Sequence, residues 1–235
     1  MVGRVEYLSA LGIDDWQQRR PLAEAVNAAR ADAGAGITAA TAQAPAAADE
    51  RWEDIAAEVA ACRKCGLCET RTRTVFGVGD RNARWLVVGE APGAEEDRQG
   101  EPFVGRAGGL LNSMLRGIGL AREQVFIANV LKCRPPNNRD PAPGEVAQCL
   151  PYLERQIALL KPRIMLAVGR ISAQNLLATD TPIGKLRGQV HAFGAARIPL
   201  VVTYHPAYLL RSPTEKRKAW EDLKFARRVA AGTQA

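Results

Sequence analysis

Four short apolar runs alternate with segments of helical periodicity, and this alternation constrains the fold more than any other feature of the chain. The runs are WLVVGE (85–90), QVFIANV (124–130), RIMLAVG (163–169) and IPLVVTYHP (198–206). The segments with helical spacing are 107–120, 144–162, 170–178 and 214–230. Buried strands that alternate with helices predict a mostly parallel sheet with helices on both faces. The expected fold class is therefore α/β.

The first fifty residues differ in composition from the rest of the chain. Residues 31–49 are nearly all Ala, Gly, Thr, Gln and Pro, and they offer few large apolar side chains to bury. Such a segment is typical of a flexible linker, with an Ala-rich helix as the alternative. We expect an N-terminal arm and Ala-rich linker at 1–50 and one catalytic domain at 51–235.

Charge and cysteine content limit the classes of function. The chain has a formal net charge of +7 and a pI of about 9.4, which favours a polyanionic partner. No apolar run reaches the ~18 residues of a membrane span, and the opening stretch MVGRVEYLSALGIDDWQQRR lacks the apolar core of a signal peptide. We expect a cytoplasmic protein without membrane contact. In that reducing compartment, cysteines serve more often as ligands than as disulfides.

Residues able to form hydrogen bonds or transfer protons stand where the predicted strands end. The four runs end at or beside Glu90, Asn129, Gly169 and His205. In open parallel sheets, ligands bind outside the carboxyl ends of the strands. We therefore expect a functional site at this edge of the sheet.

Five cysteines suggest a metal centre. Cys62 and Cys65 form a CxxC pair, and Cys133 and Cys149 lie far downstream in KCRPPNNRDPAPGEVAQC. Together they can supply four thiolates, a set that zinc and iron–sulfur clusters both accept. The wide loop between the second pair favours a cluster, and zinc or unliganded core thiols remain the alternatives. Cys68 is the fifth cysteine, and we expect it not to be a ligand because the two distant cysteines complete the set.

The run GEAPGAEEDRQGEPFVGRAGGLL (89–111) is the most distinctive in the chain. It crowds four carboxylates into eight residues, which is unfavourable unless some of them are used; a tight connection with solvated acids is the structural alternative. Together with N..KCRPP at 129–136 and HPAYLLR at 205–211, in this order, the run resembles the family 4 uracil-DNA glycosylases. These are the bacterial and archaeal type with a [4Fe–4S] cluster. The resemblance extends from about residue 62 to residue 211.

The resemblance implies a three-layer α/β/α sandwich and a DNA repair enzyme. Such an enzyme flips uracil out of DNA and hydrolyses its N-glycosidic bond with an activated water, leaving an abasic site. The resemblance also implies that Cys62, Cys65, Cys133 and Cys149 hold a [4Fe–4S] cluster, which staples the CxxC segment to the sheet without redox work in the reaction. We expect a nucleoid-associated monomer that acts on single- or double-stranded DNA containing uracil.

The same motifs imply roles for individual side chains in the pocket. Phe103 would provide an aromatic face for the base, and Asn129 would pair with uracil O4 and N3–H. His205 would donate to uracil O2 as negative charge develops on the leaving base. The structural alternatives are a core Phe103, an Asn129 that caps a turn and a core His205.

The first motif supplies the remaining substrate contacts. Glu90 would stabilise the cationic sugar and orient the water. Better-known uracil glycosylases carry an Asp where Ala91 stands, so Glu90 is either a substitute for that acid or only a water-orienting group. Gly89 and Ala91 would contact the substrate on either side of Glu90. Glu96 would lie near uracil C5 and disfavour the methyl group of thymine.

The motif HPAYLLR would supply the contacts to DNA outside the pocket. Leu209 and Leu210 would wedge into the vacated base stack, as apolar side chains do in distorted duplexes. Arg211 would contact a phosphate.

Two further expectations concern other functions. A non-catalytic metal-bearing nucleic-acid-binding module is the alternative function, although such a module has no use for polar side chains converging on one crevice. Near the N-terminus, YLSALGIDDWQQRRP is similar to the opening peptide of the bacterial polymerase III psi subunit, which docks on the chi subunit. We therefore expect residues 4–21 to bind a replication protein, with an arm that packs on the domain or stays loose as the alternative.

Overall fold

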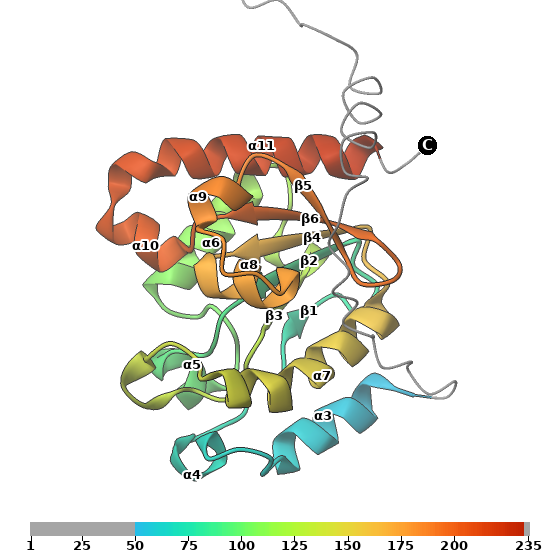
Figure 1. The fold of residues 1–235 in the computed structure, drawn as a ribbon, viewed down its shortest axis with the longest axis vertical. Coiled ribbons are helices and arrows are strands. Elements are labelled where there is room, and N and C mark those ends of the chain that lie inside the picture. Colours follow the sequence, from blue (N-terminus) through green and yellow to red (C-terminus); the bar gives the residue numbers. More distant parts are fainter. Residues whose placement is uncertain (1–49, 233–235) are drawn as a thin grey trace, which may run out of the picture. The chain divides into compact units, whose positions relative to one another are not determined.

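A six-stranded sheet runs through residues 50–232, the part of the chain that the computed structural model describes (Figure 1). The strands lie in the order β1-β3-β2-β4-β6-β5. Their bounds are Val78–Gly79 (β1), Trp85–Gly89 (β2), Phe126–Asn129 (β3), Ile164–Val168 (β4), Val190–Phe193 (β5) and Ile198–Thr203 (β6). The four central strands are parallel to one another, and β1 and β5 pair antiparallel at the two edges.

All four predicted strands are present as the central strands of the sheet. The edge strands β1 and β5 were not predicted. β1 has only two residues, too few to show a periodicity. β5 leaves Val190 and Ala192 exposed, so it lacks the apolar run by which the buried strands are recognised.

The described helices include all four predicted ones, as α6, α7, α8 and α11. Their bounds are Trp52–Ala61 (α3), Leu67–Thr70 (α4), Ala94–Gln99 (α5), Arg106–Gly117 (α6), Pro143–Leu160 (α7), Arg170–Leu177 (α8), Ile183–Leu186 (α9), Pro206–Arg211 (α10) and Lys216–Gly232 (α11). Short 3-10 turns lie at Arg122–Gln124, Pro136–Asn138 and Pro213–Glu215.

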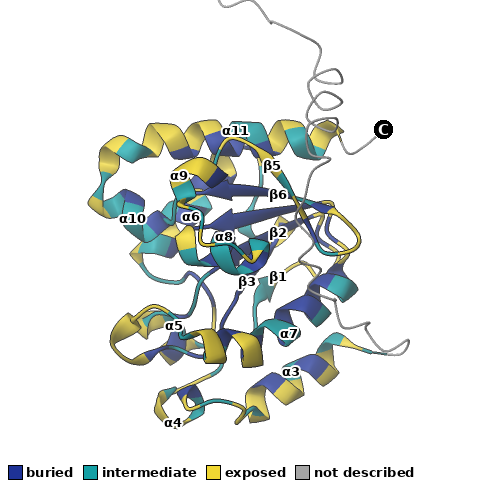
Figure 2. Cartoon of the chain, viewed as in Figure 1, coloured by how far each residue is buried: buried dark blue, intermediate teal, exposed yellow. Residues whose placement is uncertain are grey.

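Alternate residues of the central strands pack into two separate hydrophobic cores. In β2, Leu86 and Val88 belong to the core shared with α3, α7 and α8, whereas Trp85 and Val87 belong to the core shared with α6 and α11. Helices therefore cover both faces of the sheet, which confirms the predicted three-layer α/β/α sandwich. Figure 2 shows the buried strands between helices whose outer faces are exposed.

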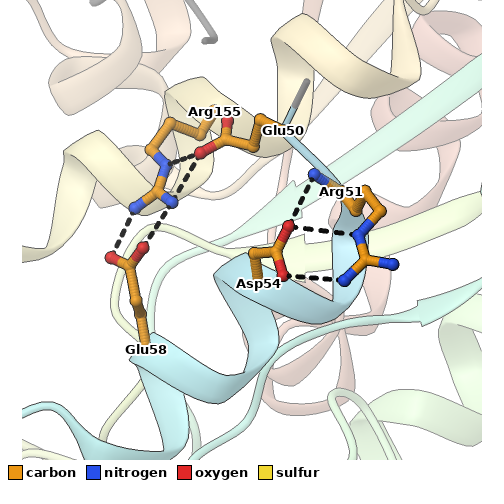
Figure 3. A network of polar contacts seen from close by, with 5 residues as sticks. All are labelled: Glu50, Arg51, Asp54, Glu58 and Arg155. Atoms are coloured by element: carbon orange, nitrogen blue, oxygen red, sulfur yellow. Dashed lines mark hydrogen bonds and ion pairs between the residues drawn. The ribbon is translucent and has the colours of Figure 1, made fainter. Parts of the chain in front are cut away.

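An ion-pair network holds α3 against α7 (Figure 3). The guanidinium of Arg155 in α7 donates from Nε to Oε1 of Glu50 at 2.7 Å, and to both carboxylate oxygens of Glu58 at 2.7 Å each. At the start of α3, Arg51 pairs with Asp54. Because α3 ends directly before the first cysteine, this network positions the beginning of the CxxC segment.

The predicted arm and linker lie outside the described residues except for residue 50, and so does the predicted partner-binding segment 4–21. Within residues 50–232, no helix is long and apolar enough to cross a membrane.

Candidate active site and cysteine pocket

The carboxyl ends of the central strands meet at one edge of the sheet. Gly89 at the end of β2 is in register with Asn129 at the end of β3. The ends of β4 and β6 are paired in the same way, through Val168 and Thr203. His205 caps α10 just beyond β6. The parallel topology thus gathers polar residues from distant parts of the sequence, as expected from the strand ends.

Asn129 lies in the interior beside Gly89 and Phe103. A β-carbon on Gly89 would lie 2.3 Å from Oδ1 of Asn129 and 2.7 Å from the ring of Phe103, so the three residues are in close contact. Asn129 is 2% exposed, and its buried Oδ1 finds no hydrogen-bond partner in the part of the chain that the structure describes. Leaving a buried acceptor unpaired costs about 1–3 kcal/mol. This oxygen is therefore the atom of the site that would gain most from a donor on a ligand.

The backbone of Phe103 is held in a left-handed conformation with φ of 54°. The guanidinium of Arg122 donates to the carbonyl oxygens of Phe103 at 3.3 Å and Pro102 at 2.6 Å. Gly108 of α6 leaves room for the same carbonyl, because a β-carbon there would lie 1.7 Å from the Phe103 oxygen. The position of the Phe103 ring is thus imposed by its surroundings.

His205 stacks on Phe103 and is neutral. The two ring centroids lie 5.5 Å apart with an interplanar angle of 30°. Nδ1 of His205 accepts from the backbone N–H of Ala207 at 3.1 Å, so the neutral ring carries its proton on Nε2. The pKa of His205 is lowered to about 4, chiefly by burial and also by the charge of Arg211, against an opposing effect of Glu96. At physiological pH, Nε2–H is therefore a donor on an uncharged ring.

Glu90 follows β2 in a partly buried position. The pKa of Glu90 is raised to about 7, chiefly by burial and also by the charge of Asp140, against an opposing effect of Arg170. Arg170 and Asp140 also pair with each other at 2.7 Å, so their charges partly cancel beside Glu90. A carboxyl group that titrates near neutrality can take up a proton under working conditions. Ala91, the next residue, packs against the core that contains α7.

Two carboxylates of the 89–111 run hydrogen-bond to the backbone. Oε1 of Glu96 accepts from the N–H of Val104 at 3.0 Å, which fixes the loop after Phe103. Both oxygens of Asp97 accept from the N–H of Thr72, at 2.9 and 3.0 Å, and tie α5 to the segment after the CxxC pair. Asp97 was not predicted from the sequence, because its partner lies 25 residues away and no local pattern reveals it.

The two leucines proposed as a wedge into DNA differ in burial. Leu209 is 1% exposed and belongs to the core beneath α6, on which α10 packs. Consecutive residues of a helix point in different directions, so the two leucines cannot share one exposed face. Leu210 is half-buried and Arg211 is exposed, and these two remain candidates for contact with DNA.

All five cysteines line one pocket, which also includes residues of α7. Cys133 and Cys149 are buried. Nη1 of Arg71 donates to Sγ of Cys133 at 3.1 Å, and the backbone N–H of Lys132 donates to Sγ of Cys149 at 3.1 Å. Donors directed at sulfur suit thiolates that carry negative charge. Within residues 50–232, no group of three or more His, Cys, Asp or Glu side chains is arranged to hold a metal ion.

Lys132 is a buried cation that was not predicted from the sequence. It is 1% exposed, and its Nζ donates to the carbonyl oxygen of Asn129 at 3.0 Å and to Oε1 of Gln156 at 2.6 Å. Burial lowers the pKa of Lys132 to about 8, and Cys149 opposes the shift. A lysine at the end of an apolar run is usually taken as the point where the chain reaches solvent, so no sequence pattern indicated its burial.

Comparison with known proteins identifies the relatives of this chain. A family model described as the uracil DNA glycosylase superfamily matches residues 76–224. A type-4 uracil-DNA glycosylase of Archaeoglobus fulgidus is 46% identical over 181 residues, which are 74% of this chain and 91% of that protein. One of Thermotoga maritima is 40% identical over 76% of this chain and 94% of its own length. A type-5 uracil-DNA glycosylase of Thermus thermophilus is 36% identical over 45% of this chain.

Proposed function

The chain belongs to the uracil DNA glycosylase superfamily, and on this premise we propose that it is a DNA repair hydrolase that removes uracil from DNA. It would hydrolyse the N-glycosidic bond with an activated water and leave an abasic site. The observation that carries the proposal is the buried Oδ1 of Asn129, which has no hydrogen-bond partner among residues 50–232 and lies beside Phe103.

Recognition of the base would depend on Asn129. Uracil presents N3–H as a donor beside O4 as an acceptor, and cytosine reverses both. Oδ1 of Asn129 would accept from N3–H while its amide nitrogen donates to O4, and Phe103 would stack on the base after it leaves the duplex. Cytosine would leave both groups of the amide unpaired. A site built on such hydrogen bonds can reject the wrong base by ~10⁴–10⁵.

His205 would stabilise the departing base. When the glycosidic bond breaks, its electron pair goes to the base, and negative charge collects on uracil O2. The Nε2–H of neutral His205 would donate to that oxygen. A donor that is already in position stabilises developing charge without reorganisation. The bond from Ala207 to Nδ1 supports this role because it fixes the tautomer.

Glu90 would act on the sugar side of the bond. The sugar passes through a cationic, oxocarbenium-like state, which a nearby carboxylate stabilises while it orients the attacking water. The raised pKa of Glu90, about 7, also allows it to accept the proton that the water loses. Gly89 and Ala91 would line the pocket on either side. Glu96 would act by holding the loop of Phe103, a role that its bond to Val104 supports better than contact with uracil C5.

The DNA would be held outside the pocket by α10. Arg211 would contact a phosphate, and the half-buried Leu210 would fill the space that the extruded base leaves.

The cysteine pocket would hold a [4Fe–4S] cluster, with Cys62, Cys65, Cys133 and Cys149 as ligands. The chemistry of the donors suits a cluster, because five thiols line one pocket and N–H groups point at two of the sulfurs, although within residues 50–232 no three of these side chains converge on the position of a single metal ion. Cys68 lines the same pocket, and we propose that it is not a ligand. When bound, the cluster would supply cross-links between the CxxC segment, the loop after β3 and α7. Metal-binding energy of this kind is folding energy.

Localisation, oligomeric state and the N-terminal segment concern the whole protein. We propose that it acts as a nucleoid-associated monomer in the cytoplasm and that residues 4–21 bind a replication protein. Deleting residues 1–48 should leave excision of uracil from naked oligonucleotides nearly intact, because the linker composition offers little to bury.

The decisive experiment is incubation of the full-length chain with an oligonucleotide containing one uracil, followed by alkali. Strand cleavage at the uracil is expected for the wild type. Asn129→Ala should abolish most of this cleavage while binding of uracil-free DNA is preserved. Intact oligonucleotide with strong DNA binding by the wild type would instead indicate a non-catalytic binding module.

A further inference from the structure

One buried side chain joins the cysteine pocket to the strand end that carries Asn129. The ammonium of Lys132 donates to the carbonyl oxygen of Asn129 at 3.0 Å and to Oε1 of Gln156 at 2.6 Å. The backbone N–H of the same lysine donates to Sγ of Cys149 at 3.1 Å. Lys132 is therefore in direct contact with both sites.

Lys132 is unfavourable at this position unless its charge has a use. The side chain is 1% exposed, and both acceptors of its ammonium are neutral oxygens. Burying an ammonium without a carboxylate partner is costly, and a methionine would fill the same space without that penalty. Packing alone therefore does not account for a lysine here.

The surroundings of Lys132 keep its ammonium in one place. Gln156 is 1% exposed, and its Nε2 donates to the carbonyl oxygen of Phe76 at 3.0 Å, which fixes the orientation of the amide. Oε1 of Gln156 is thereby directed at the ammonium. The carbonyl oxygen of Lys132 accepts from the N–H of Val75 at 2.8 Å, which holds the backbone as well. Because both the backbone and the ammonium of Lys132 are held, the backbone carbonyl oxygen of Asn129 faces a donor in a fixed position.

We propose that Lys132 is a positioning residue for base recognition. Its ammonium holds the backbone carbonyl oxygen of Asn129. The side-chain amide of Asn129 thereby keeps the orientation that uracil requires. Its backbone bond to Cys149 makes this arrangement continuous with the cysteine pocket. Lys132 does not touch the base and acts only through Asn129, so the inference rests on the proposed role of Asn129.

A double-mutant cycle between Lys132 and Asn129 tests the proposal. The full-length protein is used, and variants are compared after their visible absorbance and DNA binding have been matched to the wild type. Lys132→Met should slow single-turnover excision of uracil by about tenfold or more and weaken the binding of free uracil by a similar factor. In the Asn129→Ala background, the same change should slow excision by less than about threefold, because residues that act through one another are not additive.

Lys161→Met is the matched control. Lys161 is exposed and follows α7 at the opposite end of the sheet, so this variant also loses one positive charge but should excise uracil like the wild type. If Lys132→Met does not fold, the cycle is run with Lys132→Gln, which is neutral and keeps one donor group.

Each outcome separates the two claims. An equal slowing in both backgrounds, or a wild-type rate for Lys132→Met, would overturn the role of Lys132 and leave the proposed function intact. A wild-type rate for Asn129→Ala would overturn the role of Asn129 and, with it, that of Lys132. A strong effect of Lys132→Met only when Asn129 is present would support the proposal.

Discussion

A β-carbon on Gly89 would lie 2.3 Å from Oδ1 of Asn129, a separation at which one of the two residues must move. Gly89→Ala should therefore displace the Asn129 amide or the Phe103 ring, whose carbons would lie 2.7 Å from the added β-carbon. We expect uracil excision to fall by about 10²-fold, since a shift of ~1 Å at a reacting site has an effect of this size. Single-turnover kinetics on a uracil oligonucleotide would measure it.

Gly109→Ala is the control for this substitution. Gly109 lies in α6, and a β-carbon there meets nothing within 4 Å. Alanine is also the better helix former by roughly 0.5–1 kcal/mol. We expect unchanged excision and a slightly higher melting temperature. Equal losses in the two variants would show that Gly89 has no special place in the pocket.

Arg122→Ala should impair the enzyme through Phe103. Without the guanidinium, the carbonyl oxygens of Pro102 and Phe103 lose their donor, and the left-handed turn at Phe103 loses its support. We expect a loss of stability of ~1–3 kcal/mol, measured by denaturant unfolding. Excision should also slow more than the stability loss explains, whereas Arg116→Ala, at an exposed site on α6, should change neither. Unchanged excision in folded Arg122→Ala would mean that Phe103 keeps its place without the clamp.

The pH dependence of excision should report Glu90. The reaction uses the carboxylate, and the pKa of Glu90 is raised to about 7, so log kcat should rise with pH up to about 7 and then level off. His205, with its pKa lowered to about 4, should add no inflection between pH 5 and 7. Glu90→Gln should remove the rise along with most of the activity, whereas Glu95→Gln should leave the profile unchanged. A profile that is flat between pH 5.5 and 8 in the wild type would exclude Glu90 as the titrating base.

The raised pKa of Glu90 should make the folded protein less stable as pH rises, whereas it makes excision faster. The folded-state pKa of Glu90 lies above the ordinary value of 4.5 for a glutamate, so the folded protein keeps a proton that the unfolded chain has lost. The free energy of unfolding should therefore decrease as pH rises from about 4.5 to 7. Glu90→Gln should abolish this decrease. The stability of the variant relative to the wild type should therefore be higher at pH 8 than at pH 5.

Asn129→Asp tests the hydrogen-bond pattern of the pocket. A protonated Asp can donate to cytosine N3 and accept from its amino group, which is the reverse of what uracil requires. We expect weak excision of cytosine that grows as pH falls, measured on an oligonucleotide without uracil. Asn129→Ala cannot make this reversed pair, so it should leave cytosine in place and keep only residual excision of uracil. Uracil excision at the wild-type rate in both variants would place base recognition elsewhere.

The cysteines should differ in their effects. Cys133→Ala or Cys149→Ala should remove broad visible absorbance and destabilise the protein, because binding of the metal group is folding energy. Cys68→Ala should do neither, although it lines the same pocket. Loss of colour in Cys68→Ala together with its retention in Cys62→Ala would overturn the proposed ligand set.

The sequence predicted what depends on local periodicity. The four central strands and their polar ends were recognisable because each is an apolar run that stops at a residue such as Asn129 or His205. Lys132, Asp97 and Arg122 were missed because their roles depend on partners that are distant in sequence. The left-handed Phe103 was missed for a related reason, since its conformation is imposed by Arg122. The burial of Leu209 was not foreseen because the helix register of so short a segment as α10 is not visible in its sequence.

The order of the two sites along the chain also affects when a growing chain becomes able to act on DNA. All five cysteines lie at or before residue 149, within a segment that ends with α7, whereas His205 follows β6. Proteins are translated from the N-terminus, so a ribosome that has reached the end of α7 has delivered every thiol but no imidazole for the pocket. All the thiols of the cysteine pocket are therefore synthesised before the nascent chain has the residues that it needs to act on DNA.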